Sequence, residues 1–250
     1  MTFKNLVLAT AALGLGCGAH ASVISSGFYV GMGGGMERMN GQRSERMDTD
    51  PTAFEAQVFT NKQDMKKHGH LLNLFGGYLY KWNCFAIAGE AFYEFGRIED
   101  KITRTWVDSP GVLDFKGNYS ASLEKKNSFG FRINIGGILK DRFFAYALLG
   151  LSASQLRYST TASLLDPTAP AAYKQEFEAS RKLAYGFDYG LGLQYQVNQW
   201  RLGVEGYIRN IKSQTLSFKF NDPHLHPQPV FHATFKPLMT VVTVKFSLTF

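Results

Sequence analysis

Apolar and polar positions alternate with a period of two along much of this chain. The clearest segment runs from Tyr185 to Val197, where aromatic and aliphatic residues occupy every odd position and Gly, Asp or Gln the even ones. This is the pattern of a strand with one apolar and one polar face. Similar alternation predicts further strands near residues 26–37, 70–82, 85–97, 127–139, 143–156, 200–209 and 242–250. Each is long enough to cross a bilayer as a tilted strand.

The connections between these strands alternate between very short and long. The short ones are Asn83-Cys84, Lys140-Asp141-Arg142 and Asn198-Gln199, and the long ones cover about 38–69, 98–126, 157–184 and 211–237. The predicted fold is all-β: an eight-stranded antiparallel up-and-down transmembrane β-barrel with both termini on the side of the short turns and four long polar loops on the other. A soluble lipocalin-like barrel is the structural alternative, but it would place its apolar faces inside.

The first residues have the layout of an export signal. Lys4 precedes an apolar stretch from Leu6 to about Gly16, and Ala19-His20-Ala21 provides small residues for cleavage. We expect residues 1–21 to be a signal peptide and residues 22–250 to form the barrel domain. A lipoprotein would use Cys17, but Gly14 stands where such sites usually carry an aliphatic residue.

Composition agrees with a β-barrel and limits the partners. The chain has 25 Gly, 21 Phe, 12 Tyr and 3 Trp, and no apolar run long enough for a membrane-spanning helix. The formal net charge is +7, but no stripe of Lys and Arg with interleaved aromatics marks a nucleic-acid-binding face. We therefore expect no nucleic-acid partner. Removal of the signal would leave Cys84 as a free thiol in a short turn.

Four stretches of sequence carry a resemblance to a known group of proteins: residues 27–35, with glycine alternating at Gly31, Gly33 and Gly35, residues 89–93 and 203–207, and the closing residues 244–250. They resemble the small eight-stranded outer-membrane proteins of the OmpA-type and opacity-type group. The resemblance implies location in the cell outer membrane and contact with outer-membrane lipid and lipopolysaccharide. It also implies recognition by the barrel-assembly machinery through Phe246, Leu248 and Phe250.

Polar residues of the strands project to the predicted interior. By parity this set is Glu90, Glu94, Arg132, Asn134, Asp188, Arg201, Glu205, Arg209 and Lys245. Counting from the short turns places the charged residues in two layers, with Glu90, Arg132, Glu205 and Lys245 within reach of one another. Eight strands leave room only for side chains, and dry carboxylates need partners. The pattern predicts an interior plugged by ion pairs.

Two groups of residues have a chemical alternative. Glu90 and Glu94 share a face and could act as an acid/base pair, although structural ion networks also place charges together. Five histidines in or beside the predicted first and fourth loops could hold zinc or copper, but exposed loop histidines fit such loose spacing better: His68, His70, His224, His226 and His232. We expect no metal and no cofactor.

The catalytic alternative rests on short motifs. Asp48-Thr49-Asp50 and Asp222-Pro223-His224 are similar to the Asp-x-Asp and Asp-x-His pairs of outer-membrane proteases, which have ten strands and a longer chain. The His-x-Ser pair of lipid A deacylases is missing after the signal. We therefore expect a protein that is not an enzyme.

The predicted function is that of a surface protein. The four external loops would contact host or cell-surface ligands in adhesion, and the barrel would contribute to envelope integrity. A narrow porin passing small solutes is the alternative, and a barrel hydrolase is a more remote one. Nothing in the loops identifies their ligand.

Overall fold

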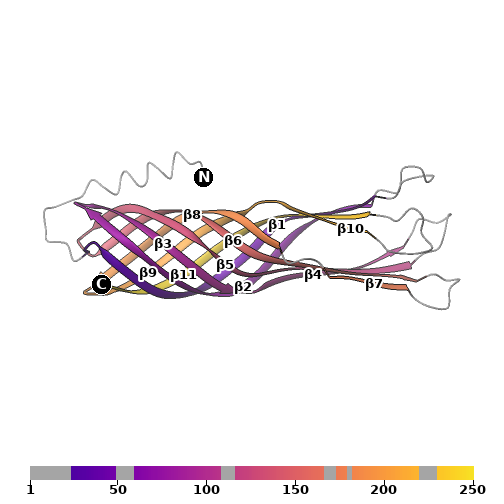
Figure 1. Ribbon diagram of the computed structural model, residues 1–250, viewed down its shortest axis with the longest axis horizontal. Coiled ribbons are helices and arrows are strands. Elements are labelled where there is room, and N and C mark those ends of the chain that lie inside the picture. The colour runs from indigo at the N-terminus through magenta and orange to yellow at the C-terminus, as the bar shows by residue number, and fades with distance from the viewer. Residues whose placement is uncertain (1–23, 49–58, 108–115, 166–172, 179–181, 220–229) are drawn as a thin grey trace.

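The computed structural model describes residues 24–48, 59–107, 116–165, 173–178, 182–219 and 230–250, which form strands and short turns (Figure 1). Among these residues, no helix is long and apolar enough to cross a membrane. The strands are β1 (Gly27–Asp48), β2 (Phe59–Trp82), β3 (Phe85–Gly96), β4 (Ile98–Val107), β5 (Lys116–Leu139), β6 (Phe143–Leu165), β7 (Tyr173–Glu178), β8 (Lys182–Val197), β9 (Trp200–Ile211), β10 (Gln214–Lys219) and β11 (Val230–Thr249).

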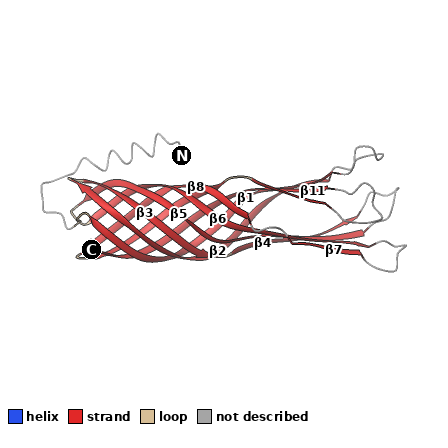
Figure 2. Ribbon diagram, viewed as in Figure 1, coloured by secondary structure: helices blue, strands red, loops and turns tan. Residues whose placement is uncertain are grey.

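Eight of these strands close into an antiparallel ring. The order around the ring is β1, β2, β3, β5, β6, β8, β9 and β11, and β11 pairs with β1 to close it, with Tyr29 opposite Thr249. Figure 2 shows the ring as a cylinder of tilted strands. Closure leaves no free sheet edge within the ring, because every strand has two hydrogen-bonded neighbours. The predicted eight-stranded up-and-down barrel is confirmed.

Short turns join the strands at one end of the barrel. Asn83, Lys140, Asp141 and Asn198 have positive φ angles of 47° to 60°, a region in which Asn and Asp are favoured over other non-glycine residues. Phe250 lies at the same end, and the N–H of Ile24 donates to the carbonyl of Asp141 there. The described chain therefore begins and ends on the side of the short turns, as predicted.

The four long polar loops are the part of the prediction that is wrong. Most of their residues continue the barrel strands: β1 runs on to Asp48, β2 begins at Phe59, and β4, β7 and β10 add further ladders. Beyond the ring, the pairing of β1 with β2 and with β11 persists up to Met47 and Asp48. The loops are shorter than predicted, because the backbone groups outside the barrel are still hydrogen-bonded between neighbouring strands.

These extensions form two four-stranded sheets at the end of the barrel opposite the short turns. One sheet has the order β10-β11-β1-β2 and the other β4-β5-β6-β7. They separate because β2 leaves β3 after Leu71 and Gly96, and β8 leaves β9 after Gly186 and Ile211. Figure 1 shows the result as two arms, one containing β1 and β10 and the other β4 and β7.

Where the ring ends, the outward face of β1 changes from apolar to polar and its inward face begins to carry apolar residues. Within the ring the outer face of β1 is apolar, and the exposed fractions of Phe28, Met32 and Met36 are 67%, 58% and 57%. Beyond Met36 the same outer face continues with Arg38, whereas the inward-facing Met39 is fully buried. A chain with apolar residues outside and then inside passes from lipid to water, so the outer edge of the apolar band lies between Met36 and Arg38.

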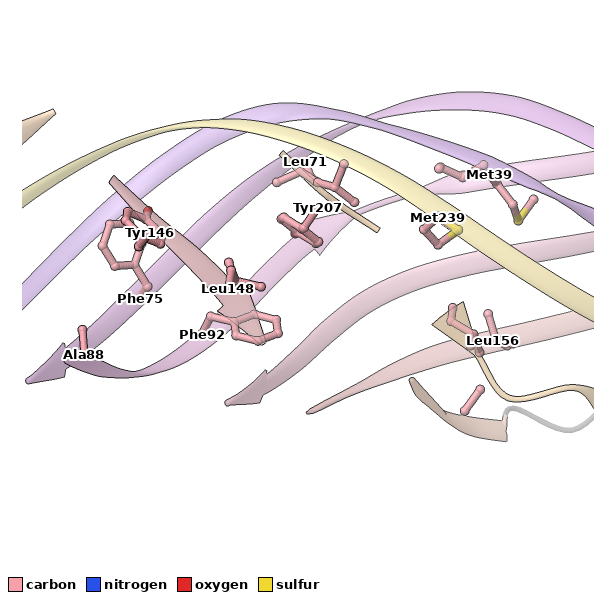
Figure 3. Packing of buried hydrophobic residues seen from close by; sticks show 14 of the residues in the cluster. Met39, Leu71, Phe75, Ala88, Phe92, Tyr146, Leu148, Leu156, Tyr207 and Met239 are labelled. Carbon is pink, nitrogen blue, oxygen red and sulfur yellow. The ribbon is translucent and has the colours of Figure 1, made fainter. Parts of the chain in front are cut away.

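The two outer sheets share an apolar core. Tyr158 of β6 and Phe235 of β11 meet across the sheets with their ring centroids 4.9 Å apart. The guanidinium of Arg43 on β1 lies 5.7 Å from the centroid of each ring. In Figure 3, Met39, Met239 and Leu156 gather toward one end of the inward-facing set and Tyr146 and Phe75 toward the other. The extension is thus a small β-sandwich continuous with the barrel.

Candidate functional site

The interior of the barrel holds the polar residues that parity projected there. The buried set contains Glu90, Glu94, Arg132, Asn134, Asp188, Arg201, Glu205, Arg209 and Lys245. Their strands alternate regularly between outward and inward positions, as in β9, where every second residue from Arg201 is buried. The regular alternation of side chains therefore places charged residues of different strands together in the narrow interior of the barrel.

Four charged residues form the cluster nearer the extension. The guanidinium of Arg209 donates to both oxygens of Asp188, at 2.9 and 2.8 Å, and to Glu94 Oε2 at 2.7 Å. Arg132 Nη2 donates to Glu94 Oε1 at 2.7 Å and to Asp188 Oδ2 at 3.2 Å. The hydroxyl of Tyr207 also donates to Glu94. Two cations thus share two carboxylates in a closed, charge-balanced arrangement.

The second cluster lies nearer the short turns and has one cation. Lys245 Nζ donates to both oxygens of Glu90 at 2.7 Å and to Glu205 Oε1 at 3.0 Å. The hydroxyls of Tyr146 and Tyr29 donate to Glu205 and Glu90 at 2.6 and 3.2 Å. Lys245 is therefore the one cation hydrogen-bonded to these two carboxylates among the described residues, and tyrosine hydroxyls supply further donors.

An ion pair joins the two clusters, and aromatic rings pack against its guanidinium. Arg132 Nη1 lies 3.7 Å from Glu205 Oε2, which links the clusters. The same guanidinium lies 3.7 Å from the ring centroid of Phe92 and 4.1 Å from that of Tyr207. The charged side chains in these pairs are at most 2% exposed. This arrangement can brace the barrel and block it, because ion pairs and rings occupy the interior between the strands.

The interior does not arrange Glu90 and Glu94 as an acid/base pair. They share a face of β3, but Glu90 is bound by Lys245 and Glu94 by Arg132 and Arg209. Each carboxylate is engaged by cations of the structural network, so the geometry gives no support to the catalytic interpretation.

Arg201 lies apart from both clusters, close to the short turns. Its Nε donates to Gln196 at 2.8 Å, and its guanidinium lies 5.3 Å from the ring centroid of Tyr29. Its Nη2 reaches the carbonyl of Ser25 at 3.5 Å, next to the buried Ile24. Arg201 thus connects the start of the described chain to the inner wall of the barrel.

Sequence reasoning missed a buried ion pair at the outer end of the barrel. Lys125 Nζ donates to Glu37 Oε2 at 2.6 Å, and both side chains are fully buried. Glu37 has the inward parity of Gly33 and Gly35, which was a usable signal. Lys125 could not be found this way, because a register shift between Lys125 and Ser128 inverts the parity of β5.

The candidate metal ligands are not brought together. His68 and His70 are exposed on β2 opposite Arg38 and Met36, whereas His232 lies on β11 opposite Arg46. Eight positions of β1, about 26 Å at 3.3 Å per residue, separate the levels of His68 and His232. The described ranges contain no group of three or more His, Cys, Asp or Glu able to hold a metal ion.

Other predicted site residues fall at the ends of strands or outside the described ranges. His224, His226, Asp50 and Asp222 lie outside them, and Asp48 is the last residue of β1. Phe246 and Leu248 lie on the outward face of β11, where the rings of Phe246 and Trp200 stack at 4.9 Å. The role of Phe246, Leu248 and Phe250 in assembly stays a prediction.

The exterior completes the picture of a membrane barrel. Exposed aromatic residues, such as Trp82, Trp200 and Phe250, flank the short turns, and an apolar band follows them along every strand of the ring. Outer-membrane barrels carry such a band between aromatic girdles. Fold and surface together define a transmembrane β-barrel of the outer membrane.

The chain belongs to the family of the outer membrane protein beta-barrel domain, whose profile matches residues 7–226. Its location is therefore the outer membrane. The family is mostly non-enzymatic. A search of curated protein sequences finds no significant match.

Several solved structures are similar in fold. The outer membrane protease OmpT from Escherichia coli is 9% identical, with 91% of this chain and 99% of that chain covered and a TM-score of 0.44. Neisserial surface protein A is 11% identical, with coverage of 91% and 100% and a TM-score of 0.33. The attachment invasion locus protein Ail of Yersinia pestis, in complex with the heparin analogue sucrose octasulfate, is 14% identical, with coverage of 83% and 98% and a TM-score of 0.25. At these identities the likeness concerns the fold alone.

Proposed function

We propose that this protein is a non-enzymatic surface-display protein, in which a closed barrel anchors a β-sandwich that carries four hairpin ends away from the membrane. The observation that carries the proposal is the contact of Tyr158 with Phe235 across the two outer sheets. A packed core is what an extension needs in order to hold its ends in fixed positions. Contact with host surfaces, other cells or envelope polymers would then take place at the hairpin ends, and the anchored barrel would contribute to envelope integrity.

The length of the extension fits this role. From Met36, at the edge of the apolar band, to Asp48 there are twelve residues of β1, or about 40 Å along the strand. That path exceeds the thickness of a bilayer's hydrocarbon core, about 30 Å. The last paired positions of β1 therefore lie well beyond the lipid headgroups.

The charged interior argues against the alternative of a narrow porin. Its ion pairs are buried and joined through Arg132, so a solute would have to break several of them. Planar-bilayer recordings of the purified protein distinguish the two functions. We expect no stable conductance steps, and regular ion-conducting steps would favour the porin.

The strand register allows a sharp test of display. Arg46 faces Thr60, Val107 faces Lys116, Leu164 faces Tyr173 and Lys219 faces Val230. Replacing the residues between each pair by Asn-Gly, a favoured two-residue hairpin turn, removes the four ends and keeps both sheets.

Vesicles carrying the folded full chain or the shortened variant would be applied to cultured epithelial cells and to bacterial cells. We expect binding by the full chain and its loss in the shortened variant, with both forms showing the same heat-modifiable mobility on gels. Equal binding by the two forms would refute display through the hairpin ends. Shortening one hairpin at a time then identifies which end carries the contact.

A further inference from the structure

The first described residues of the chain lie across the mouth of the barrel at the end that carries the short turns. We infer that residues 24–26, the mouth strap, close this end and keep periplasmic water and ions away from the charged interior. Ile24 is 2% exposed, whereas Ser25 and Ser26 are exposed. The inference goes beyond surface display, which needs an anchored barrel but not a closed mouth.

The mouth strap crosses the opening from the start of β1. The turn between β5 and β6, the fourth and fifth strands of the ring, lies nearly opposite β1, and the N–H of Ile24 donates to the carbonyl of Asp141 in this turn at 3.3 Å. Eight tilted strands about 4.8 Å apart give a barrel about 16 Å across. The three residues from Gly27 back to Ile24 reach about 10 Å when extended. Ile24 therefore lies over the opening and not at its rim.

Two further hydrogen bonds hold the rest of the mouth strap. Arg201 Nη2 on β9 donates to the carbonyl of Ser25 at 3.5 Å, and the N–H of Lys81 on β2 donates to Ser26 Oγ at 2.9 Å. The guanidinium of Arg201 is itself held in place, because its Nε donates to Gln196 at 2.8 Å. Together with the β5–β6 turn, these contacts come from three parts of the ring, so the strap is held on several sides of the mouth.

The wall of the mouth is apolar on one side and polar on the other. On β2, β3, β5 and β6 the inward-facing residues close to the short turns are apolar and buried: Leu79, Ala86, Ile138 and Phe144. On β8, β9 and β11 they are polar: Gln196, Arg201 and Ser247. Ile24 belongs to the same buried apolar cluster as the first set. Apolar side chains beside an open mouth would meet water, and Ile24 provides the cover that they need.

The cluster of Lys245 lies one step farther into the barrel. The guanidinium of Arg201 lies 5.3 Å from the ring centroid of Tyr29, and the hydroxyl of Tyr29 donates to Glu90 of that cluster at 3.2 Å. On β11, Lys245 is the next inward-facing position after Ser247 of the mouth. Ion pairs weaken when water reaches them, because the local dielectric constant rises. A closed mouth therefore preserves the ion pairs that brace the barrel.

The test measures how fast a thiol inside each end of the barrel reacts with a small water-soluble thiosulfonate. In a Cys84→Ser background, Ser247→Cys places a thiol beside the mouth, and Ser154→Cys places one at the end next to the extension; both positions are buried. We expect Ile24→Asp to speed the labelling of Ser247→Cys by about tenfold or more, because labelling follows the population in which the mouth is open. Labelling of Ser154→Cys should stay unchanged.

A matched control adds the same charge without changing the mouth strap. Gln199 is exposed in the β8–β9 turn at the rim of the mouth, so Gln199→Asp should leave both labelling rates unchanged. Equal acceleration by the control, or at both thiol positions, would overturn the inference, because charge or general loosening would then explain the effect. An unchanged rate at Ser247→Cys in the Ile24→Asp variant would also overturn it, since the lining side chains would then close the mouth without the strap.

A further measurement leaves Ile24 unchanged. Ser25→Cys provides an exposed reference thiol, and we expect Ser247→Cys to react far more slowly. Equal rates at the two positions would show an open mouth and refute the inference. All variants are compared as the folded full chain with heat-modifiable mobility on gels, and the milder Ile24→Ser replaces Ile24→Asp if the latter does not fold.

Discussion

Lys245 should be the most sensitive charged residue of the barrel interior. It is the only cation within hydrogen-bonding distance of both Glu90 and Glu205 among the described residues. Lys245→Met keeps an unbranched chain of similar length and removes the charge, which leaves two buried carboxylates against each other. Glu205→Gln, in contrast, leaves Lys245 bound to both oxygens of Glu90 and leaves Arg132 bound to Glu94 and Asp188.

The magnitudes follow from what each substitution leaves behind. Removing one partner of a buried ion pair costs about 3–5 kcal/mol. Lys245→Met strands Glu90 and leaves Glu205 with only Arg132 at 3.7 Å, so we expect it to cost about 5 kcal/mol. Glu205→Gln perturbs hydrogen bonds but strands no cation, so we expect about 1–3 kcal/mol. Glu99→Gln, which affects an exposed pair with Arg97 at 3.4 Å, should cost about 0.5 kcal/mol or less.

Urea unfolding of the barrel in lipid vesicles, followed by tryptophan fluorescence, measures these differences. A second substitution provides the sharper check: Lys245→Met/Glu205→Gln should be more stable than Lys245→Met alone, because it removes one of the two opposed carboxylates. If Lys245→Met proved no less stable than Glu205→Gln, or if the double variant were the least stable, a single-cation cluster could not be the arrangement in the folded barrel.

Three further predictions concern packing, assembly and the thiol. Gly192→Ala should destabilise the barrel by about 1–3 kcal/mol, because the added Cβ would lie 2.3 Å from the ring of Tyr146. Gly206→Ala is the control and should be neutral, because its Cβ meets nothing within 4 Å. Equal unfolding midpoints for the two variants would contradict this prediction. Deleting Phe250 should lower the amount of heat-modifiable protein in the outer membrane relative to Phe250→Tyr, and unchanged amounts would argue against an assembly role. Cys84, half-buried in its turn, should react with a maleimide under non-reducing conditions, and a disulfide-linked dimer as the main species would count against a free thiol.

The sequence determined the ring of eight strands and much of its interior. Inside a membrane barrel the two faces of a strand meet lipid and a narrow polar interior, so segments such as β8 and β9 alternate without interruption. The same alternation projected Glu90, Glu94, Arg132, Asp188, Glu205, Arg209 and Lys245 inward, and the structure places all of them in the two clusters. The parity of a position along its strand predicts whether the side chain faces inward or outward. Because the barrel is narrow, inward-facing side chains at similar levels come into contact.

Only the tertiary structure decided what happens beyond the membrane. There the apolar residues turn inward, so a stretch such as residues 37–43, with Met39 inside and Arg38 outside, reads as mixed polar sequence unless the opposing sheet is known. Tyr158 and Phe235 form a core because β5–β6 and β11–β1 pairing carries two sheets face to face, a consequence of ring closure. Lys125 reaches Glu37 because an extra residue in β5 reverses its side-chain parity, and pairing over 88 positions of sequence is fixed by packing and not by any local preference.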